Sequence, residues 1–365
     1  MAMEVDDAVA AKGWVVRDLE GLRSLRAGWN DLVPATAPPT HGFTWTEAAA
    51  QTFYPHRRLA VVGVGSPTAP RGLAPLVCDS TTPFRPYWQI GAAELTEPAD
   101  LLYADPAGAR ELAEALVGAR LPILLRRVPA DSAVVDALRA AAPGRAMVYQ
   151  RAELGVPFLD LDSSWSEPGS QLSSRRRADL RRARRRADEE GEVTIDIFGP
   201  DPEELPATLD EAMAVEARSW KGRGGTALVH DARRAAFFRA WALEMSAAGV
   251  LRVGFLRIDK HAVAMQLSVE HGDIHWILKI GYDDSVARCS PGSLLTSAMI
   301  ADAAQRGLCR YEFLGWPAKW IETWTGAEHD LVTVAMSPLR LRGVAAFAPD
   351  AVREVQRRRM VGEGV

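Results

Sequence analysis

Residues 250–293 read VLRVGFLRIDKHAVAMQLSVEHGDIHWILKIGYDDSVARCSPGS. Three apolar runs, at 250–259, 261–270 and 273–283, follow one another with the dipeptides DK and HG as turns. Turns this short join neighbouring antiparallel strands. The stretch therefore predicts a three-stranded meander that ends in a loop with proline and glycine, where a helix can begin.

The sequence around the meander predicts a regular order of helices and strands. The expected elements are a strand at 192–200, helices at 201–220 and 231–249, a helix at 293–307, and strands at 309–315 and 330–337. Helices that alternate with mostly antiparallel strands place the chain in the α/β (α+β) class.

The first 150 residues alternate in the same way. The expected elements there are a hairpin made of 57–65 and 71–80, a helix at 105–120, a strand at 121–129 and a helix at 131–142. Residues 156–170 are rich in Ser, Pro and Asp and mark a boundary. We therefore expect an N-terminal domain at 1–155, a C-terminal domain at 156–340 and a basic tail at 341–365.

The composition is that of a soluble globular protein. The chain has 365 residues, 48% of them hydrophobic and 25% charged, with a net charge of −4. This length suits two hydrophobic cores, and the mildly acidic balance does not favour polyanion binding by the molecule as a whole. The start of the chain lacks the apolar region of a signal peptide, and no apolar run reaches the ~20 residues of a membrane span. Because the three cysteines are widely spaced and odd in number, we expect no disulfide framework, no metal site and a cytoplasmic location.

The segment SSRRRADLRRARRRADEEG at 173–191 contains eight arginines, four acidic residues and no aromatic residue. A narrow apolar stripe of leucine and alanine predicts a helix that ends at Gly191. A nucleic-acid arm would usually add aromatic residues for base stacking. We interpret most of the arginines as a solvated, ion-paired face and single out Arg175 and Arg182 as candidates to reach an anionic substrate.

The order of elements from residue 156 onward resembles the acyl-CoA N-acyltransferase fold of the GNAT superfamily. Individual motifs resemble its BioF2-like, or CelD-like, acetyltransferase branch, which is related to the FemAB peptidyltransferases. These motifs are LSSRRRADLRRARRRADEEGEVTI, VEARSWKGRGG, LRVGFLRIDKHAVAMQL, LKIGYDDSVARCSPGSLL and CRYEFLGWPAKWIETWT. The resemblance covers about 156–336 and implies that the first 150 residues are a degenerate copy of the same fold. It thus implies two tandem GNAT-like domains, each with a mixed, mostly antiparallel sheet flanked by helices.

The resemblance implies that the loop ARCSPGS holds the pyrophosphate of the acyl donor. In such enzymes the backbone N–H groups of this loop, and the dipole of the helix that follows, bind the phosphates. Ser290, Gly292 and Ser293 are the implied contacts, and Arg288 adds a positive charge. Ala287 and Ser290 depart from the usual Q/R-x-x-G-x-G/A pattern. The expected donor is acyl-CoA, with acetyl-CoA first. Because of the departure, an acyl carrier protein or another thioester is an alternative donor. On its own, the loop is also typical of a plain turn.

The candidates for proton transfer are Glu216, His275, Glu312 and Tyr282. A neutral imidazole or a buried carboxylate can take the proton of an attacking ammonium. Each of the two glutamates could instead form an ion pair with a nearby arginine. The family places a tyrosine before Lys319, where this chain has Ala318, so Tyr282 or a water is the candidate to reprotonate the leaving thiolate.

Strand alternation along 273–283 puts His275, Ile277 and Lys279 on one face. This face could border the acyl donor, and it is equally typical of the solvent side of a sheet. The candidates for substrate binding are Trp220, Lys221, Lys279 and Lys319. For Trp220 the alternative is anchoring in the core.

The function that the resemblance implies is an N-acyltransferase in which an amine of a small molecule or peptide attacks the thioester of acyl-CoA directly. A backbone N–H of the splayed central strand would polarise the carbonyl. One alternative is a FemAB-like transferase that uses aminoacyl-tRNA, although tRNA binding is not expected from the arginine run. The other alternative is a non-catalytic acyl-CoA-binding protein.

Overall fold

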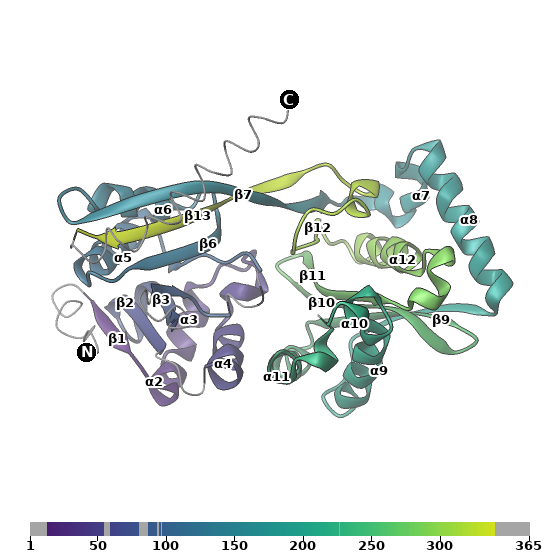
Figure 1. Cartoon of the computed structure of the whole chain (residues 1–365), viewed down its shortest axis with the longest axis horizontal. Coiled ribbons are helices and arrows are strands. Elements are labelled where there is room, and N and C mark those ends of the chain that lie inside the picture. The colour runs from purple at the N-terminus through teal and green to yellow at the C-terminus, as the bar shows by residue number, and fades with distance from the viewer. Residues whose placement is uncertain are drawn as a thin grey trace.

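The computed structural model describes residues 13–54, 59–79, 87–92, 95, 97–225 and 227–339. The two halves of the chain lie side by side, and two long strands run from one half to the other (Figure 1). The predicted basic tail at 341–365 lies outside the described residues.

The described strands pair in one continuous path, in the order β1-β2-β3-β4-β6-β13-β7-β12-β11-β10-β9-β8, and β5 pairs with β3. Their bounds are β1 (Trp14–Val16), β2 (Leu59–Ser66), β3 (Ala69–Asp79), β4 (Tyr87–Ile90), β5 (Leu102–Tyr103), β6 (Ile123–Pro129), β7 (Ala146–Asp160), β8 (Val193–Phe198), β9 (Leu251–Ile258), β10 (His261–His271), β11 (Ile274–Tyr282), β12 (Arg310–Glu312) and β13 (Glu328–Pro338). The described pairs are antiparallel, except for β4 with β6 and β11 with β12.

The two halves repeat one arrangement. In the N-terminal half, β2, β3 and β4 are antiparallel neighbours, α5 (Pro106–Gly118) follows, and β6 returns parallel to β4. In the C-terminal half, β9, β10 and β11 are antiparallel neighbours, α12 (Pro291–Gln305) follows, and β12 returns parallel to β11. The predicted fold class, with two tandem copies of one plan, is therefore confirmed.

The two halves exchange their last strands. β13 comes at the end of the second half but pairs with β6 of the first, and β7 comes at the end of the first half but pairs with β12 of the second. β7 and β13 also pair with each other along most of their length. Residue 155, where the first domain was predicted to end, lies inside β7, and the division into 1–155 and 156–340 stays a prediction.

Helices cover both faces of the sheet. The longer ones, besides α5 and α12, are α2 (Leu19–Ser24), α3 (Arg26–Leu32), α4 (Phe43–Thr52), α6 (Ala133–Ala141), α8 (Ser174–Glu190), α9 (Leu205–Ala217) and α11 (Ala232–Ala247). In the C-terminal half, α8 and α12 share one buried cluster with the strands, whereas α9 and α11 share another. The short helices are α7 (Pro168–Gln171) and α10 (Trp220–Arg223).

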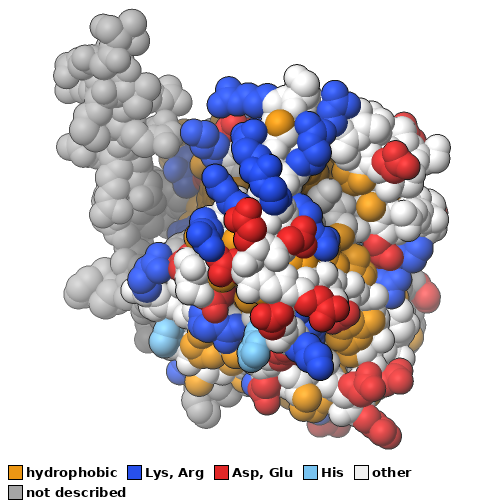
Figure 2. Space-filling view, turned by 90° about the vertical axis from the view of Figure 1, so that its right-hand side faces the viewer, with side chains coloured by type: hydrophobic (Ala, Val, Ile, Leu, Met, Phe, Trp, Pro, Cys, Tyr) orange, Lys and Arg blue, Asp and Glu red, His pale blue; other side chains and the backbone are white. Residues whose placement is uncertain are grey.

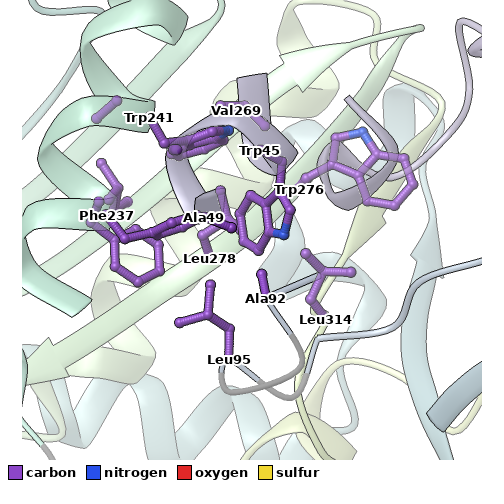
Figure 3. Close-up of a cluster of buried hydrophobic side chains, with 14 of the residues drawn as sticks. Trp45, Ala49, Ala92, Leu95, Phe237, Trp241, Val269, Trp276, Leu278 and Leu314 are labelled. Carbon is purple, nitrogen blue, oxygen red and sulfur yellow. The ribbon is translucent and has the colours of Figure 1, made fainter. Parts of the chain in front are cut away.

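Aromatic side chains join the two halves between α4 and α11. The Trp45 ring lies edge to face with Phe237 and Trp241, with ring centroids 4.8 and 5.6 Å away. Trp45 is 2% exposed, and Figure 3 shows it among Leu278 and other side chains of the second half. Edge-to-face pairs add ~0.5–1.5 kcal/mol to the effect of burial. The cluster therefore fixes α4 against α11.

The predicted elements of the second half are present with shifted ends. β9, β10 and β11 form the predicted meander, and α8 ends at Gly191 as expected. The helix predicted at 201–220 is shorter, because residues 201–204 form a turn before α9 begins at Leu205 with Pro206 in its first turn. Proline is favoured in the first turn of a helix because it has no backbone N–H that would need a hydrogen-bond acceptor there.

A β-bulge between β10 and β11 changes the alternation predicted for β11. Leu267 pairs with Lys279 and Ser268 pairs with Ile277, so Leu278 is an extra residue. His275 stacks on Tyr311 in the cluster of α8 and α12. The Lys279 Nζ atom instead lies 4.7 Å from the ring centroid of Phe238 in α11, on the opposite face. The prediction that His275 and Lys279 share a face is therefore wrong, because one inserted residue reverses the side chains that follow.

Candidate active site

β11 and β12 separate beyond a short paired region. Only Ile274–Trp276 of β11 pairs with Arg310–Glu312 of β12. Among the described strands, none pairs with residues 277–282 of β11 on this side. The edge of β11 therefore presents backbone N–H and C=O groups that no neighbouring strand uses.

The chain passes from β11 to α12 through a loop that turns sharply at Ser290. Ser290 has φ 46° and ψ 50°, in the left-handed region that non-glycine residues seldom adopt. Its carbonyl accepts hydrogen bonds from the N–H groups of Ser293 and Leu294, and Pro291 starts the helix. The Gly292 N–H belongs to the first turn, where no intrahelical acceptor exists and the helix dipole is positive. This helix start is suited to an anion.

A cavity of about 380 Å³, which we call the β11–α12 cavity, lies between this helix start and the edge of β11. The predicted site residues in its walls are Lys221, Tyr282, Ser290, Gly292 and Ser293. Leu295, Ala318 and Trp320 add apolar surface. The fold thus gathers five of the predicted residues around one cavity that has a polar end and an apolar wall.

Lys221 is held against β11 by Glu216. The Lys221 Nζ atom is 3.0 Å from Glu216 Oε1 and donates to the Ile280 carbonyl at 2.6 Å. Glu216 Oε2 accepts the Leu228 N–H at 2.9 Å, and the residue is 2% exposed. Both carboxylate oxygens are thus engaged, and Glu216 is not among the residues that line the cavity. In this arrangement Glu216 positions Lys221 at the cavity wall.

His275 lies behind the cavity in a buried hydrogen-bonded network. Its Nδ1 is 2.7 Å from Glu270 Oε1, and its Nε2 is 3.0 Å from Gln266 Nε2. Burial lowers the pKa of His275 and favours the neutral ring, although Glu270 acts in the opposite direction; a neutral ring would donate to the Glu270 carboxylate through Nδ1. Gln266 also bonds to Tyr311 and lines the cavity, so it stands between His275 and the cavity. Because His275 is 0% exposed, the solvent-face interpretation of this residue is wrong.

Glu312 and Lys319 do not line the β11–α12 cavity. Glu312 is buried on β12, with Oε1 2.9 Å from His329 Nε2. Lys319 is exposed beside a smaller cavity that it shares with Glu322. The side chain of Trp220 lies outside the described part of the structure. The roles predicted for these three residues stay predictions.

A second cavity, of about 190 Å³, lies between the N-terminal half and the loop after β12; we call it the Trp316 cavity. In this loop the Gly315 N–H donates to Glu97 Oε2 at 3.1 Å, and the Arg127 guanidinium lies 4.0 Å from the Trp316 ring centroid. Trp316 lines the second cavity, and Ala318, two residues later, lines the first. The same loop therefore forms a wall of both cavities.

Glu97 is the candidate functional residue that the sequence analysis missed. It lines the Trp316 cavity within electrostatic range of Lys279, Arg127 and Lys221. Burial raises the pKa of Glu97, and these cations and the Gly315 N–H oppose the rise. A carboxyl group with a raised pKa in a cleft suits general-base catalysis. Its sequence context, AAELTEPAD, has no periodicity or motif that singles it out.

The arginines predicted to meet an anion lie outside the β11–α12 cavity. Arg288 forms an ion pair with Glu190 of α8, and Arg182 pairs with Asp179 in the same helix. Arg175 is exposed and forms no ion pair with another described residue.

A metal-ion cluster and a membrane-spanning helix are both absent from the described residues. Within the described parts of residues 13–225 and 227–339, no group of three His, Cys, Asp or Glu side chains is placed to bind a metal ion. No helix in the same ranges has the length and apolar character to span a membrane.

The comparisons with known proteins agree with this architecture. Residues 174–328 match the family model described as Acetyltransferase (GNAT) domain. The C-terminal domain of a proposed lysylphosphatidylglycerol synthetase from Agrobacterium fabrum is similar in structure, with a TM-score of 0.54 at 12% identity over 91% of this chain and 96% of that one. FemX is also similar, with a TM-score of 0.53 at 12% identity over 89% of this chain and 97% of FemX. No curated protein matches the chain by sequence.

The family match defines the class of protein. The chain carries a GNAT acetyltransferase domain in residues 174–328 and is an acyltransferase. At 12% identity, the likeness to FemX and to the synthetase domain shows a shared fold. Membership of the narrower BioF2-like branch stays a prediction.

Proposed function

We propose that the protein is an N-acyltransferase that moves an acyl group from acyl-CoA, acetyl-CoA first, to an amine of a small molecule or peptide. The observation that carries the proposal is the β11–α12 cavity, which lies between the open edge of a strand and the start of a 15-residue helix. The helix start suits the phosphates of the donor, and the strand edge suits its extended arm.

In the proposed complex, Ser290, Gly292 and Ser293 bind the pyrophosphate. The Gly292 N–H and the positive end of the helix dipole attract the phosphates, and the serine hydroxyls donate further hydrogen bonds to them. The Ala287 and Ser290 departures from the family pattern do not remove this feature, because it depends on backbone groups at the helix start.

Backbone groups of β11 and Lys221 orient the thioester. Lys221 reaches the Ile280 carbonyl, and the N–H of a strand residue points to the same edge as its carbonyl. The Ile280 N–H is therefore the proposed donor to the thioester oxygen, whose negative charge grows when the amine attacks.

The amine approaches from the Trp316 cavity, and Glu97 accepts its proton. The amine nitrogen forms a bond to the carbonyl carbon, the carbon–sulfur bond breaks, and the thiolate leaves. Tyr282, in the wall of the first cavity, supplies the proton that the thiolate takes up. Two observations support this assignment. The loop after β12 lines both cavities, and Glu97 lies close enough to Lys221 for their charges to interact.

The direct test is to incubate the protein with acetyl-CoA and a panel of amines, and to follow free thiol with a chromogenic disulfide. The proposal predicts thiol release that requires both the protein and an amine, together with an acetylated amine detected by mass spectrometry. Absence of thiol release with every thioester, combined with no CoA bound in native mass spectrometry, would refute it.

A further inference from the structure

The arginines at the start of α8 are not explained by the proposed acyl transfer. Four exposed or half-buried arginines have no ion pair among the described residues: Arg175, Arg176, Arg177 and Arg181. The arginines that follow them in α8 pair within the helix: Arg182 with Asp179, Arg184 with Asp188 and Arg185 with Glu189. Cations near a helix start and acids near its end both oppose the macrodipole. Helix stability therefore does not account for this arrangement of charges.

A groove runs beside these arginines. This α8–α12 groove, of about 340 Å³, has apolar walls that include Leu180, Ile195 and Leu294. Arg181 and Arg184 also line it and give it a basic rim. An apolar groove with a basic rim suits an amphipathic helix with acidic side chains beside its apolar face.

The groove lies next to the β11–α12 cavity. Leu294 lines the groove, and its neighbours Ser293 and Leu295 line the cavity, so the first turn of α12 separates the two. At the other end of α8, Arg186 donates to the Arg288 carbonyl in the loop before α12. A ligand in the groove would therefore sit beside the place where the donor's phosphates are expected.

The length of the basic surface indicates a macromolecule. At 1.5 Å per residue, Arg181 and Arg175 lie roughly 8 and 16 Å from Arg186 along the helix. Figure 2 shows Lys and Arg side chains gathered across the upper part of this end of the molecule. A partner that contacts these arginines while its thioester enters the cavity must extend along α8 from Arg186 to Arg175.

We infer that the α8–α12 groove docks an acidic helix of a carrier protein that bears the acyl group as a thioester on a phosphopantetheine arm. The inference rests on the proposed function, because it names the carrier of the same thioester. The arginines match the acidic residues of the carrier, and the start of α12 takes the single phosphate of the arm. RNA fits less well, because α8 lacks aromatic side chains for stacking and places four acids among its arginines.

The test compares donors in a charge-reversal variant. Arg175→Glu, Arg176→Glu and Arg181→Glu are combined, and the matched control combines Arg110→Glu, Arg139→Glu and Arg233→Glu, three arginines of other helices. The donors are acetyl-CoA and an acetylated fatty-acid-synthesis acyl carrier protein. For the α8 variant the expected loss in kcat/KM is at least tenfold with the carrier protein and under twofold with acetyl-CoA. The control should lose under twofold with both donors.

Binding of the fluorescently labelled carrier, measured by anisotropy, separates the two proposals. If no donor releases thiol, the proposed function fails, and carrier binding that is lost only in the α8 variant still supports the docking site. Three results would overturn the inference. They are an equal loss of kcat/KM with both donors, no binding of the carrier, and displacement of the carrier by bulk tRNA at a concentration below that of the carrier. If the triple variant does not fold, the corresponding Arg→Gln variant gives the same comparison.

Discussion

Glu97 places a carboxyl group of the N-terminal half beside the loop that follows β12 in the C-terminal half. It accepts the Gly315 N–H at 3.1 Å and acts on Lys279 and Lys221 across the boundary. In the proposed mechanism Glu216 positions Lys221 and Glu97 is the base, because Lys221 and the Leu228 N–H already bind the two oxygens of Glu216. Whether Glu97 or Glu216 is the general base therefore depends on which carboxylate has an oxygen near the acceptor amine.

Replacing Glu97 with glutamine should lower kcat by roughly 10²- to 10⁴-fold, the usual effect of losing a general base. A base must be ionised, so kcat/KM of the wild type should rise with pH through the raised pKa of Glu97, and this rise should vanish in the variant. The measurement is a pH–rate profile. Glu153→Gln is the control, because Glu153 lines the same cavity but pairs with Arg151 at 2.7 Å. If both variants behave alike, Glu97 is not the base.

At the scale of elements, β11 determines the geometry of the site. Its first residues hold β12, its bulge at Leu278 turns Lys279 towards α11, and its last residues form the cavity edge. β11 also passes close to α9, because a Cβ added at Gly281 would lie 3.0 Å from the Glu216 Cα atom. The absence of a side chain at Gly281 therefore sets the distance between strand and helix.

Gly281→Ala should lower the free energy of unfolding by about 1–3 kcal/mol, as overpacking usually does. Gly169→Ala is the matched control, because an added Cβ there meets nothing within 4 Å, and its effect should stay within about 0.5 kcal/mol. Urea unfolding followed by circular dichroism measures both. Equal stability of the two variants would mean that β11 and α9 can move apart without cost.

The sequence predicted more of the elements than of the contacts between them. The meander, the loop and α12 follow from local periodicity and from proline and glycine, whereas Ser290, Gly292 and Ser293 are singled out in that loop by the resemblance to GNAT enzymes. The bulge at Leu278 could not, because apolar residues occupy both faces of β11 and hide the change of register. Glu97 could not either, since its importance comes from Lys279 and Gly315, which lie far along the chain.

At the scale of the whole molecule, we expect the two halves to unfold as one cooperative unit. β7 and β13 are exchanged between the halves, and the cluster around Trp45 fills the space between α4 and α11. Both cavities share the loop after β12, and one of them uses residues of the N-terminal half. The first half therefore lines part of the candidate site, whereas the match to the acetyltransferase domain covers residues 174–328.

Trp45→Ala should lower the free energy of unfolding by about 3–5 kcal/mol, because it leaves a large cavity between the halves. Trp316→Ala, at a tryptophan that is 43% exposed, should cost only about 1 kcal/mol or less. Guanidinium unfolding with far-UV circular dichroism and tryptophan fluorescence gives the two values. Two separate transitions in the wild type would contradict a single cooperative unit.

The central claim is that the start of α12 binds the phosphates of the acyl donor, and a pair of substitutions at Gly292 tests it most directly. An added Cβ there meets only Tyr282 Cδ1, at 3.4 Å, so Gly292→Ala should fit, whereas Gly292→Asp places a negative charge at the helix start. The measurement is KM with acetyl-CoA and with S-acetyl-N-acetylcysteamine, a thioester without phosphates. We predict that Gly292→Asp raises KM for acetyl-CoA about tenfold or more, equivalent to ~1.4 kcal/mol, and leaves the short thioester and the Gly292→Ala variant unaffected. An unchanged KM for acetyl-CoA in Gly292→Asp, or an equal rise with both thioesters, would contradict the claim.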